Sequence, residues 1–171
     1  MQYPTIGPHF FTATILDWEH ILTEDTYKDV IIECLQFLVN NKRIHLYGFV
    51  IMNNHVHFIW QPLQTFTLTE IQLSFMTFTA RAIKAKLNRE NPTMLERFRV
   101  NKYDRKYQIW KREPLSVELT EASFFTQKLK YIHNNPVRAE LIKFAEDYRY
   151  SSAAFYDSGI DPFNMLIHYK G

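Results

Sequence analysis

Apolar residues in the first sixty positions fall into three short runs that predict β-strands. Residues 9–16 alternate loosely between apolar and polar side chains, whereas residues 44–52 and 55–60 are almost continuously apolar. The pair Asn53-Asn54 separates the second run from the third. Because asparagine tolerates positive φ angles, this pair predicts a tight hairpin between two strands.

Two longer segments have apolar residues at helical spacing. The first begins at Thr23, a suitable N-cap, and runs to about residue 41. The second covers residues 68–88 and opens on the capping box Thr67-Leu68-Thr69-Glu70. A strand, a helix, two strands and a second helix are therefore expected in this order.

A short apolar run at 108–110, ended by Pro114, predicts a fourth strand, and a third helix follows it. The polar segment 91–104 is expected to be a long loop. This order of elements is typical of a ferredoxin-like fold. We therefore predict an α+β protein with a ferredoxin-like antiparallel sheet backed by two helices, plus a C-terminal helix. A single domain is expected over residues 1–171, with its core at about 9–156 and an irregular tail over 157–171.

Composition agrees with a globular protein. The 171 residues are 46% hydrophobic and 16% aromatic, which suffices for one buried core and excludes a disordered chain. No apolar run reaches the length of a membrane span, so no membrane partner is expected. The first residues lack the features of a signal peptide, and the lone cysteine, Cys34, cannot form an intrachain disulfide. A reduced, cytoplasmic location is expected.

The net charge of +2 hides a basic segment, Arg81–Arg112. This segment holds eleven Lys and Arg residues against three acids, a local net charge of +8. Aromatic residues interleave with these charges, which suits single-stranded nucleic acid because its bases stack on aromatic rings. The aromatics are Phe98, Tyr103, Tyr107 and Trp110. A solvated helix face followed by a basic loop is the alternative. The candidate DNA-binding residues are Arg81, Lys84, Arg97, Arg99, Lys102, Arg105, Lys106, Lys111 and Arg112.

His55 and His57 lie two residues apart in the third predicted strand. Side chains at positions i and i+2 of a strand point to the same face, so both imidazoles project from one side of the sheet. Val56, Phe58 and Trp60 then point the other way, into a core. A rigid strand would hold two neutral imidazoles, the commonest metal ligands, at a fixed separation. The alternative is a pair of structural histidines that are satisfied by hydrogen bonds at a hairpin end.

The third helix is predicted to begin after Thr120, its N-cap, with Glu121 at the first helical position. Pro136 cannot extend it, so the helix should end at about Asn135. The four-residue spacing places Tyr131, on the last turn, and Asn135 on one face. This face would present a phenol that can attack and an amide oxygen that can coordinate a hard cation.

Taken together, these segments resemble the single-tyrosine HUH transposases, in the branch called REP-associated tyrosine transposases. The resemblance spans roughly residues 9–156, in the family's order. It is carried by Met52-Asn53-Asn54-His55-Val56-His57, Tyr131-Ile132-His133-Asn134-Asn135-Pro136-Val137-Arg138-Ala139 and Asp147-Tyr148-Arg149-Tyr150-Ser151-Ser152-Ala153. The sequence departs from the family at Asn53, where proline is usual, and at Glu140, where glycine is common. The first difference should alter a turn, and the second should alter the cap after the helix.

The resemblance implies a transposase that nicks and rejoins single-stranded or hairpin DNA through a 5′-phosphotyrosine. It makes Tyr131 the nucleophile and His55, His57 and Asn135 the ligands of Mg²⁺ or Mn²⁺. Two imidazoles without cysteine would also suit zinc, copper or iron, but an amide oxygen and a phosphate substrate favour the harder cations. Relatives include homodimers, in which the tyrosine helix serves the partner's metal site, and monomers, so both states remain open.

Two other functions remain open from the residues alone. In a metal-dependent hydrolase, water would be the nucleophile and Tyr131 would be dispensable. In a noncatalytic module, an RNA-recognition-like sheet would bind nucleic acid, but the strands show no basic-aromatic signature of that kind. A covalent protein–DNA adduct would separate the three functions.

Overall fold

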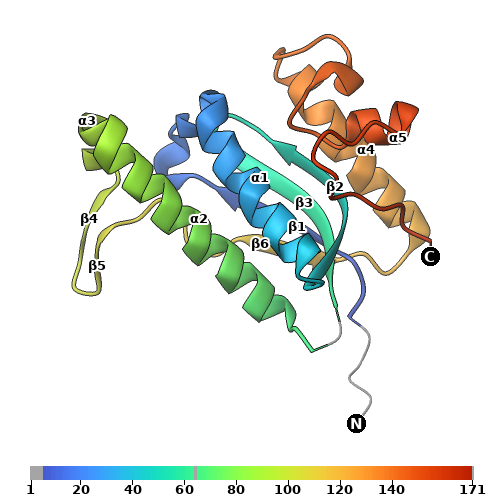
Figure 1. Cartoon of the computed structure of the whole chain (residues 1–171), viewed down its shortest axis with the longest axis horizontal. Coiled ribbons are helices and arrows are strands. Elements are labelled where there is room, and N and C mark those ends of the chain that lie inside the picture. Colours follow the sequence, from blue (N-terminus) through green and yellow to red (C-terminus); the bar gives the residue numbers. More distant parts are fainter. Residues whose placement is uncertain (1–5, 64, 171) are drawn as a thin grey trace.

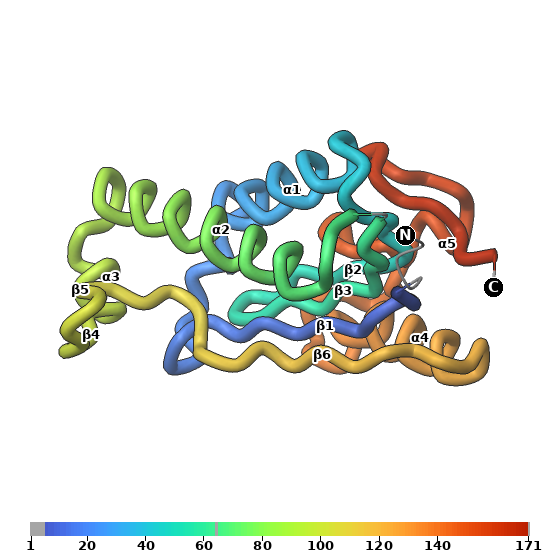
Figure 2. The backbone as a smooth tube through the Cα atoms, turned by 90° about the horizontal axis from the view of Figure 1, so that it is seen from below, coloured from blue at the N-terminus to red at the C-terminus, as the bar shows by residue number. Residues whose placement is uncertain are grey.

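Four antiparallel strands form a sheet in the middle of three layers (Figures 1 and 2). The computed structural model describes residues 6–63 and 65–170. The strands follow the order β2-β3-β1-β6, which is that of a ferredoxin-like sheet, so the predicted fold class is confirmed. Their bounds are β1 (His9–Thr14), β2 (Ile44–Ile51), β3 (His55–Pro62) and β6 (Leu115–Glu118).

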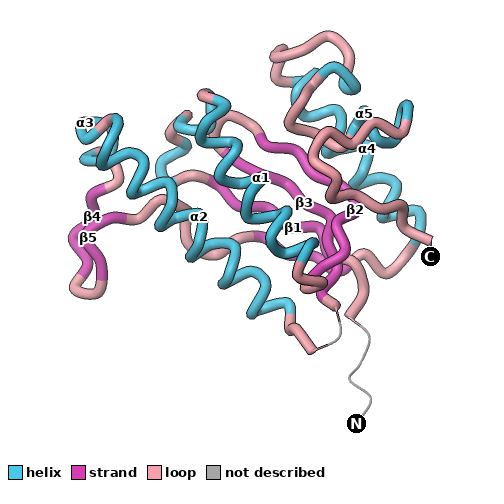
Figure 3. The backbone as a smooth tube through the Cα atoms, in the orientation of Figure 1, coloured by secondary structure: helices cyan, strands magenta, loops and turns pink. Residues whose placement is uncertain are grey.

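Two long helices cover one face of the sheet and a third covers the other (Figure 2). The first two are α1 (Asp25–Asn40) and α2 (Leu68–Glu90), and the third, α4 (Ala122–Arg138), contacts β2 and β3. Within residues 6–63 and 65–170, no helix combines the length and the apolarity that a membrane span needs. The short elements are η1 (Leu16–Trp18), η2 (Ile21–Thr23), α3 (Pro92–Glu96), β4 (Arg99–Lys102), β5 (Arg105–Tyr107), η3 (Ala145–Asp147) and α5 (Ala153–Ser158). Figure 3 labels α3, β4, β5 and α5 among them.

Alternation along the strands divides the core between the two faces of the sheet. Phe11, Phe58 and Trp60 are fully buried in the large cluster beneath α1 and α2. Phe10 and Ile59, which neighbour them in sequence, belong to a smaller apolar cluster beneath α4. Successive side chains of a strand point to opposite faces, so the same strands supply both clusters.

A two-residue turn joins β2 to β3, as predicted, and the Met52 N–H donates to the His55 carbonyl at 2.8 Å. Neither Asn53 nor Asn54 has a positive φ angle, so the expected reason for the two asparagines is wrong. On β2, a Cβ added to Gly48 would come within 2.8 Å of Leu129 Cδ1. Glycine at this position therefore allows α4 to approach the sheet.

Two of the three predicted helix starts are wrong by one residue. Helix α1 is capped by Glu24 rather than Thr23, and α4 is capped by Glu121 rather than Thr120. Neither glutamate side chain makes a capping hydrogen bond, so local preference for a threonine cap does not decide these ends. The capping box predicted at the start of α2 is confirmed.

The fourth predicted strand and the predicted long loop are both wrong. Residues 108–110 form no strand, and Trp110 makes only an isolated bridge with Ile15. The fourth strand is instead β6, at the sheet edge, and it begins directly after Pro114. Proline is tolerated at the beginning of an edge strand because its missing N–H breaks no ladder bond there. The segment 91–104 contains α3 and the first strand of the β4–β5 hairpin.

Helix α4 was predicted to end before Pro136, but it continues through this residue and ends at Arg138. Glu140 then adopts a left-handed φ angle of 56°. Its N–H donates to the Val137 carbonyl and the Leu141 N–H donates to the Pro136 carbonyl, each at 3.0 Å. This is a Schellman cap, in which glycine usually takes the left-handed position. Glu140 therefore occupies the glycine position of an ordinary Schellman cap and adds backbone strain there.

The irregular tail was expected to begin at residue 157, but α5 continues to Ser158, and the chain then lacks regular structure as far as residue 170. It nevertheless packs on the domain. Met165 is buried in the large cluster, and the Ile167 N–H donates to the Leu46 carbonyl of β2 at 3.1 Å. The core therefore extends beyond residue 156, where we expected it to end.

Candidate metal and nucleophile site

His55 and His57 project from the α4 face of β3, as predicted. Val56 and Phe58 belong to the cluster on the other face, while the His57 ring stacks on Phe10 beneath α4. The centres of the two imidazole rings are 4.8 Å apart. Strand β3 is paired on both sides, with β1 and β2, so its backbone holds this separation.

Each imidazole has one polar partner that orients it. His57 Nδ1 lies 2.7 Å from Thr12 Oγ1, directly across on β1. His55 Nδ1 lies 2.8 Å from Asn54 Oδ1. An amide oxygen only accepts, so His55 donates through Nδ1 and its Nε2 carries a lone pair. Metal-binding histidines are typically oriented in this way, through a partner on the other ring nitrogen.

Burial favours the neutral form of both rings. It lowers the pKa of His57 to about 3, with smaller contributions from the charges of His55 and Lys128. Burial also lowers the pKa of His55, and the Asn135 side chain opposes this shift. Neutral imidazoles are the form that binds metal, so no proton has to be displaced from either ring near neutral pH.

His57 Nε2 is buried and has no hydrogen-bond partner among the described residues. A buried polar atom without a partner costs on the order of 1–3 kcal/mol, so it requires an explanation. A divalent cation held by the two imidazoles and the Asn135 amide oxygen would provide one. In residues 6–63 and 65–170, no group of three His, Cys, Asp or Glu side chains could hold a metal, so this donor set needs the amide.

Tyr131 lies beside the two histidines. The centre of its ring is 5.3 Å from that of His57 and 6.0 Å from that of Phe10. Lys128 Nζ lies 5.7 Å and the Arg138 guanidinium carbon 5.9 Å from the Tyr131 ring centre. Tyr131 is 39% exposed, so a substrate can reach it. The Tyr131 phenol therefore lies near two imidazoles and near the positively charged side chains of Lys128 and Arg138.

Tyr131 was predicted to lie on the last turn of its helix. Because α4 continues to Arg138, Tyr131 instead lies about two turns before the helix end. Asn135 likewise lies inside the helix and not at its terminus. Both residues remain in regular helix, so the four-residue spacing still places them one turn apart on one face. All of these side chains belong to one chain.

Hydrogen bonds on another side of α4 fix its position on the sheet. His133 Nε2 lies 2.8 Å from Ser152 Oγ, which accepts from the Phe49 N–H of β2 at 3.0 Å. Tyr148 donates to the Ile51 carbonyl at 2.9 Å. His133 and Tyr148 therefore have structural roles.

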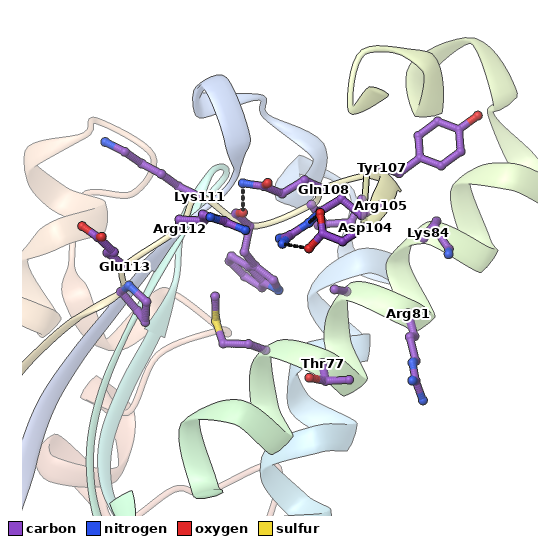
Figure 4. A pocket seen from close by; sticks show the side chains of 15 residues that line it. Thr77, Arg81, Lys84, Asp104, Arg105, Tyr107, Gln108, Lys111, Arg112 and Glu113 are labelled. Atoms are coloured by element: carbon purple, nitrogen blue, oxygen red, sulfur yellow. Dashed lines mark hydrogen bonds and ion pairs between the residues drawn. The ribbon is translucent and has the colours of Figure 1, made fainter. Parts of the chain in front are cut away.

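The basic segment borders a cleft of about 520 Å³ between α2 and the chain that leads from β5 to β6 (Figure 4). Five of the nine candidate DNA-binding residues line this cleft. They are Arg81, Lys84, Arg105, Lys111 and Arg112. The other four lie at the end of α3 and on the β4–β5 hairpin. They are Arg97, Arg99, Lys102 and Lys106.

Acidic side chains pair with three of the nine cations. The pairs are Arg97–Glu19, Arg99–Glu96 and Arg105–Asp104. The other six make no ion pair with the described residues, so they are the stronger candidates for phosphate contacts. They are Arg81, Lys84, Lys102, Lys106, Lys111 and Arg112.

The aromatic residues of the basic segment are mostly unable to stack on bases. Phe98 and Trp110 are buried in the core. Tyr107 is half-buried and donates to Glu96 at 2.6 Å. Of the four, only Tyr103 is fully exposed, in the turn of the β4–β5 hairpin. The expectation that these four rings serve nucleic-acid stacking is therefore wrong for Phe98 and Trp110.

Three residues around the site were not predicted from the sequence. Thr12 and Asn54 orient the two histidines, and Asn54 also donates to the Trp18 carbonyl at 3.3 Å. Alternation in the first strand could have indicated Thr12, because it places this residue on the opposite face from Phe11 and Ala13. No sequence pattern links Trp18 to the histidines.

The fold agrees with that of known transposases. No protein-family model matches the sequence, and no curated protein matches it. A structure of a REP-associated tyrosine transposase bound to a REP hairpin is similar, with a TM-score of 0.68 and 16% identity over 96% of this chain and 87% of that one. A candidate transposase from Deinococcus radiodurans R1 is similar with a TM-score of 0.52 and 13% identity, over 77% of this chain and 92% of that one. The fold that the sequence resemblance implied is therefore confirmed.

Proposed function

We propose that the protein is a transposase that nicks and rejoins single-stranded DNA, with Tyr131 as the nucleophile. The observation that carries this proposal is the position of the Tyr131 ring, 5.3 Å from the ring of a neutral, oriented His57 on the same chain. The shared fold with a tyrosine transposase supports it, and so do the sequence motifs around His55 and Tyr131.

His55, His57 and Asn135 would hold a divalent cation, Mg²⁺ or Mn²⁺. The unpartnered Nε2 of His57 and the influence of the Asn135 side chain on the pKa of His55 support this donor set. When bound, such a cation polarises the scissile phosphate and offsets its charge. Thr12 and Asn54 would keep the two imidazoles in their binding orientation.

Tyr131 would exchange one phosphodiester bond for another. Its phenolic oxygen attacks the phosphorus in line and its proton passes to water, while the bond from phosphorus to the 3′ oxygen breaks and that oxygen takes up a proton. The products are a 5′-phosphotyrosine and a free 3′-hydroxyl. Attack by another 3′-hydroxyl reverses the step and joins strands without an energy source. Lys128 and Arg138 would offset the charge of the non-bridging phosphate oxygens.

Single-stranded DNA would approach along the basic cleft. The Lys111 N–H donates to the Thr14 carbonyl at 2.7 Å, and Thr14 pairs with His55 in the sheet. Lys111, which lines the cleft, is therefore connected to His55 through the backbone of Thr14. The unpaired cations Lys84 and Arg112 would contact phosphates, so binding should depend strongly on salt concentration. A hairpin substrate is supported by the similar transposase that is bound to a REP hairpin.

A metal-dependent hydrolase is the second candidate, because the same donors could hold a cation that activates water. The two functions differ in their products. Hydrolysis releases DNA with a terminal phosphate and leaves nothing on the protein, whereas transesterification attaches the 5′ end to a tyrosine. In either reaction, the metal ligands and Tyr131 would come from the same chain.

A pool of single-stranded DNA hairpins with randomised flanks tests the proposal and selects the target sequence in the same experiment. The protein is incubated with the pool and Mg²⁺ or Mn²⁺, denatured, and the DNA that stays attached is sequenced. We expect adducts that are enriched in one hairpin and flank and that EDTA abolishes. The control Tyr103→Phe changes an exposed tyrosine far from the histidines in sequence, and it should leave the adducts unchanged. Cleavage without adducts would favour the hydrolase, and binding without cleavage would favour a noncatalytic module.

A further inference from the structure

Asp17 and Trp18 have a strained backbone close to the proposed site. Their φ angles are 53° and 54°, in the left-handed region that bulky residues rarely adopt. Each such residue adds backbone strain, because its Cβ comes close to a carbonyl oxygen. The Trp18 N–H donates to the Ile15 carbonyl at 3.0 Å, and the next residue, Glu19, pairs with Arg97 at 2.6 Å. Strain that the surroundings maintain in this way is concentrated at functional sites.

Burial of the indole does not offset this strain. Trp18 is 59% exposed, whereas Trp60 and Trp110 are 0% and 5% exposed. Most of the apolar surface of Trp18 therefore stays in water, and the hydrophobic effect contributes little. A ligand that covers the ring would supply the missing contact.

Asn54 connects Trp18 to the histidine site. Its Nδ2 donates to the Trp18 carbonyl at 3.3 Å, while its Oδ1 accepts from His55 Nδ1 at 2.8 Å. One side chain thus holds both the strained residue and a candidate metal ligand. The backbone of Trp18 is therefore linked to His55 through the side chain of Asn54.

Lys111 connects Trp18 to the basic cleft. Its Nζ lies 4.7 Å from the centre of the Trp18 ring, and it extends away from Arg81 and Lys84 (Figure 4). Lys111 makes no ion pair with the described residues and is held through its N–H on Thr14. An exposed ring next to the unpaired lysine of the basic cleft suits a polyanion that has flat rings.

We propose that Trp18 is a stacking platform for one base of a bound single strand, the base next to the phosphate at His55 and Tyr131. The identity of that strand as DNA rests on the proposed function. An indole face accepts any base, so the contact positions the nucleotide without reading its sequence. Lys111 contacts the phosphate of the same nucleotide. The strained backbone holds the ring at the surface, and the hydrogen bonds of Asn54 connect the Trp18 backbone to His55.

Tryptophan fluorescence tests this directly, because Trp18 is the exposed one of the three tryptophans. Tyr131→Phe protein is titrated with a single-stranded oligodeoxythymidylate of twenty nucleotides, so that binding is measured without cleavage. Stacking should quench the emission and reduce its accessibility to iodide. Adding Trp18→Phe should retain most of the affinity, because phenylalanine also stacks, but the quenching should vanish.

Trp18→Asn removes the platform and keeps the backbone, because asparagine readily adopts left-handed angles. Affinity for the oligonucleotide should fall roughly five- to hundredfold, the contribution of one stacked base. Phe37→Ala is the matched control. Phe37 is an exposed aromatic on α1 with the Arg43 guanidinium carbon 5.0 Å from its ring centre, and its loss should leave the affinity unchanged.

Full quenching in Trp18→Phe, or unchanged affinity in Trp18→Asn, would overturn the platform. Failure of the oligonucleotide to bind would also overturn it, because stacking tolerates any sequence. Covalent adducts of the protein with Tyr131 intact report separately on the proposed chemistry. Adducts without quenching would contradict only the proposal that Trp18 is a stacking platform. Quenching without adducts would contradict only the proposed transesterification.

Discussion

The two faces of the central sheet are made from the same strands but have different contents. Towards α1 and α2, the rings of Phe11, Phe58 and Trp60 are fully buried, with centres 4.7 to 5.8 Å apart. Towards α4, the neighbouring strand positions include the polar pair Thr12 and His57, whose Oγ1 and Nδ1 atoms lie 2.7 Å apart. The comparison indicates that the first face supplies stability, which allows the second face to bury polar groups.

Phe58→Ala should have the largest effect on stability. Removing a fully buried phenylalanine costs about 3–5 kcal/mol. His57→Ala should cost less, roughly 1–2 kcal/mol, because it loses the hydrogen bond with Thr12 but also removes an unpaired nitrogen. Urea unfolding followed by tryptophan emission measures both. Equal losses, or a larger loss for His57→Ala, would show that the α4 face contributes as much to stability as the other.

Asn54→Ala and Thr12→Val should each weaken divalent-metal binding by about 10- to 100-fold. This is the usual effect of replacing a residue that orients a metal-binding histidine. Calorimetric titration with Mn²⁺ measures this. Thr14→Val, two residues further along the same face of β1, is the matched control and should leave the affinity unchanged. If Thr14→Val weakened binding as much as Thr12→Val, the effect would come from the strand and not from the imidazole partners.

The metal-free protein should lose stability as the pH falls below 6.5. Burial lowers the pKa of His133 to about 4, and the pKa of His57 is lowered to about 3. Between these values and 6.5, the unfolded chain binds protons that the folded chain does not, so the free energy of unfolding decreases with falling pH. We expect a decrease on the order of 1–2 kcal/mol per histidine between pH 7 and pH 5.

Urea unfolding in EDTA at pH 7 and pH 5 measures this loss. His133→Gln should reduce the difference between the two pH values, because it removes one of the buried groups that titrate. The free energy of unfolding should stay level between pH 7 and pH 8. A protein that is equally stable at pH 5 and pH 7 would contradict the burial of these rings.

Glu140→Gly should give the smallest effect, a stabilisation of about 1 kcal/mol, because glycine adopts the left-handed angle without strain. Thermal unfolding of the variant and the parent protein measures it. Glu146→Gly, at another exposed glutamate that has no positive φ angle, is the control and should not stabilise. A destabilised Glu140→Gly would mean that the Glu140 side chain makes a contribution larger than the strain.

Local patterns explain which parts of the structure could be predicted. Alternation in β3 placed His55 and His57 on one face, and the four-residue spacing placed Tyr131 and Asn135 on one side of α4. Both depend only on the geometry of a single strand or helix. The fold class followed from the order of such elements, and the structure confirms it.

Contacts between distant segments explain what could not be predicted. The bond from Asn54 to Trp18 and the ion pair between Arg97 and Glu19 join residues 36 and 78 positions apart, and no local pattern reports them. The burial of Phe98 and Trp110 likewise depends on what covers them. At Pro136, tertiary packing overrides the local preference, because this buried proline lies within α4 where it contacts the sheet.

The identity of the nucleophile tests the proposed chemistry most directly. Protein with Tyr131 intact is allowed to react with the selected hairpin, digested, and the peptide that carries the nucleotide is sequenced by mass spectrometry. We expect the modification on Tyr131 alone, and we expect Tyr131→Phe to lose both adduct and strand cleavage at unchanged stability. Cleavage that persists in Tyr131→Phe, or an adduct on Tyr103, Tyr107 or Tyr148, would contradict the proposed role of Tyr131.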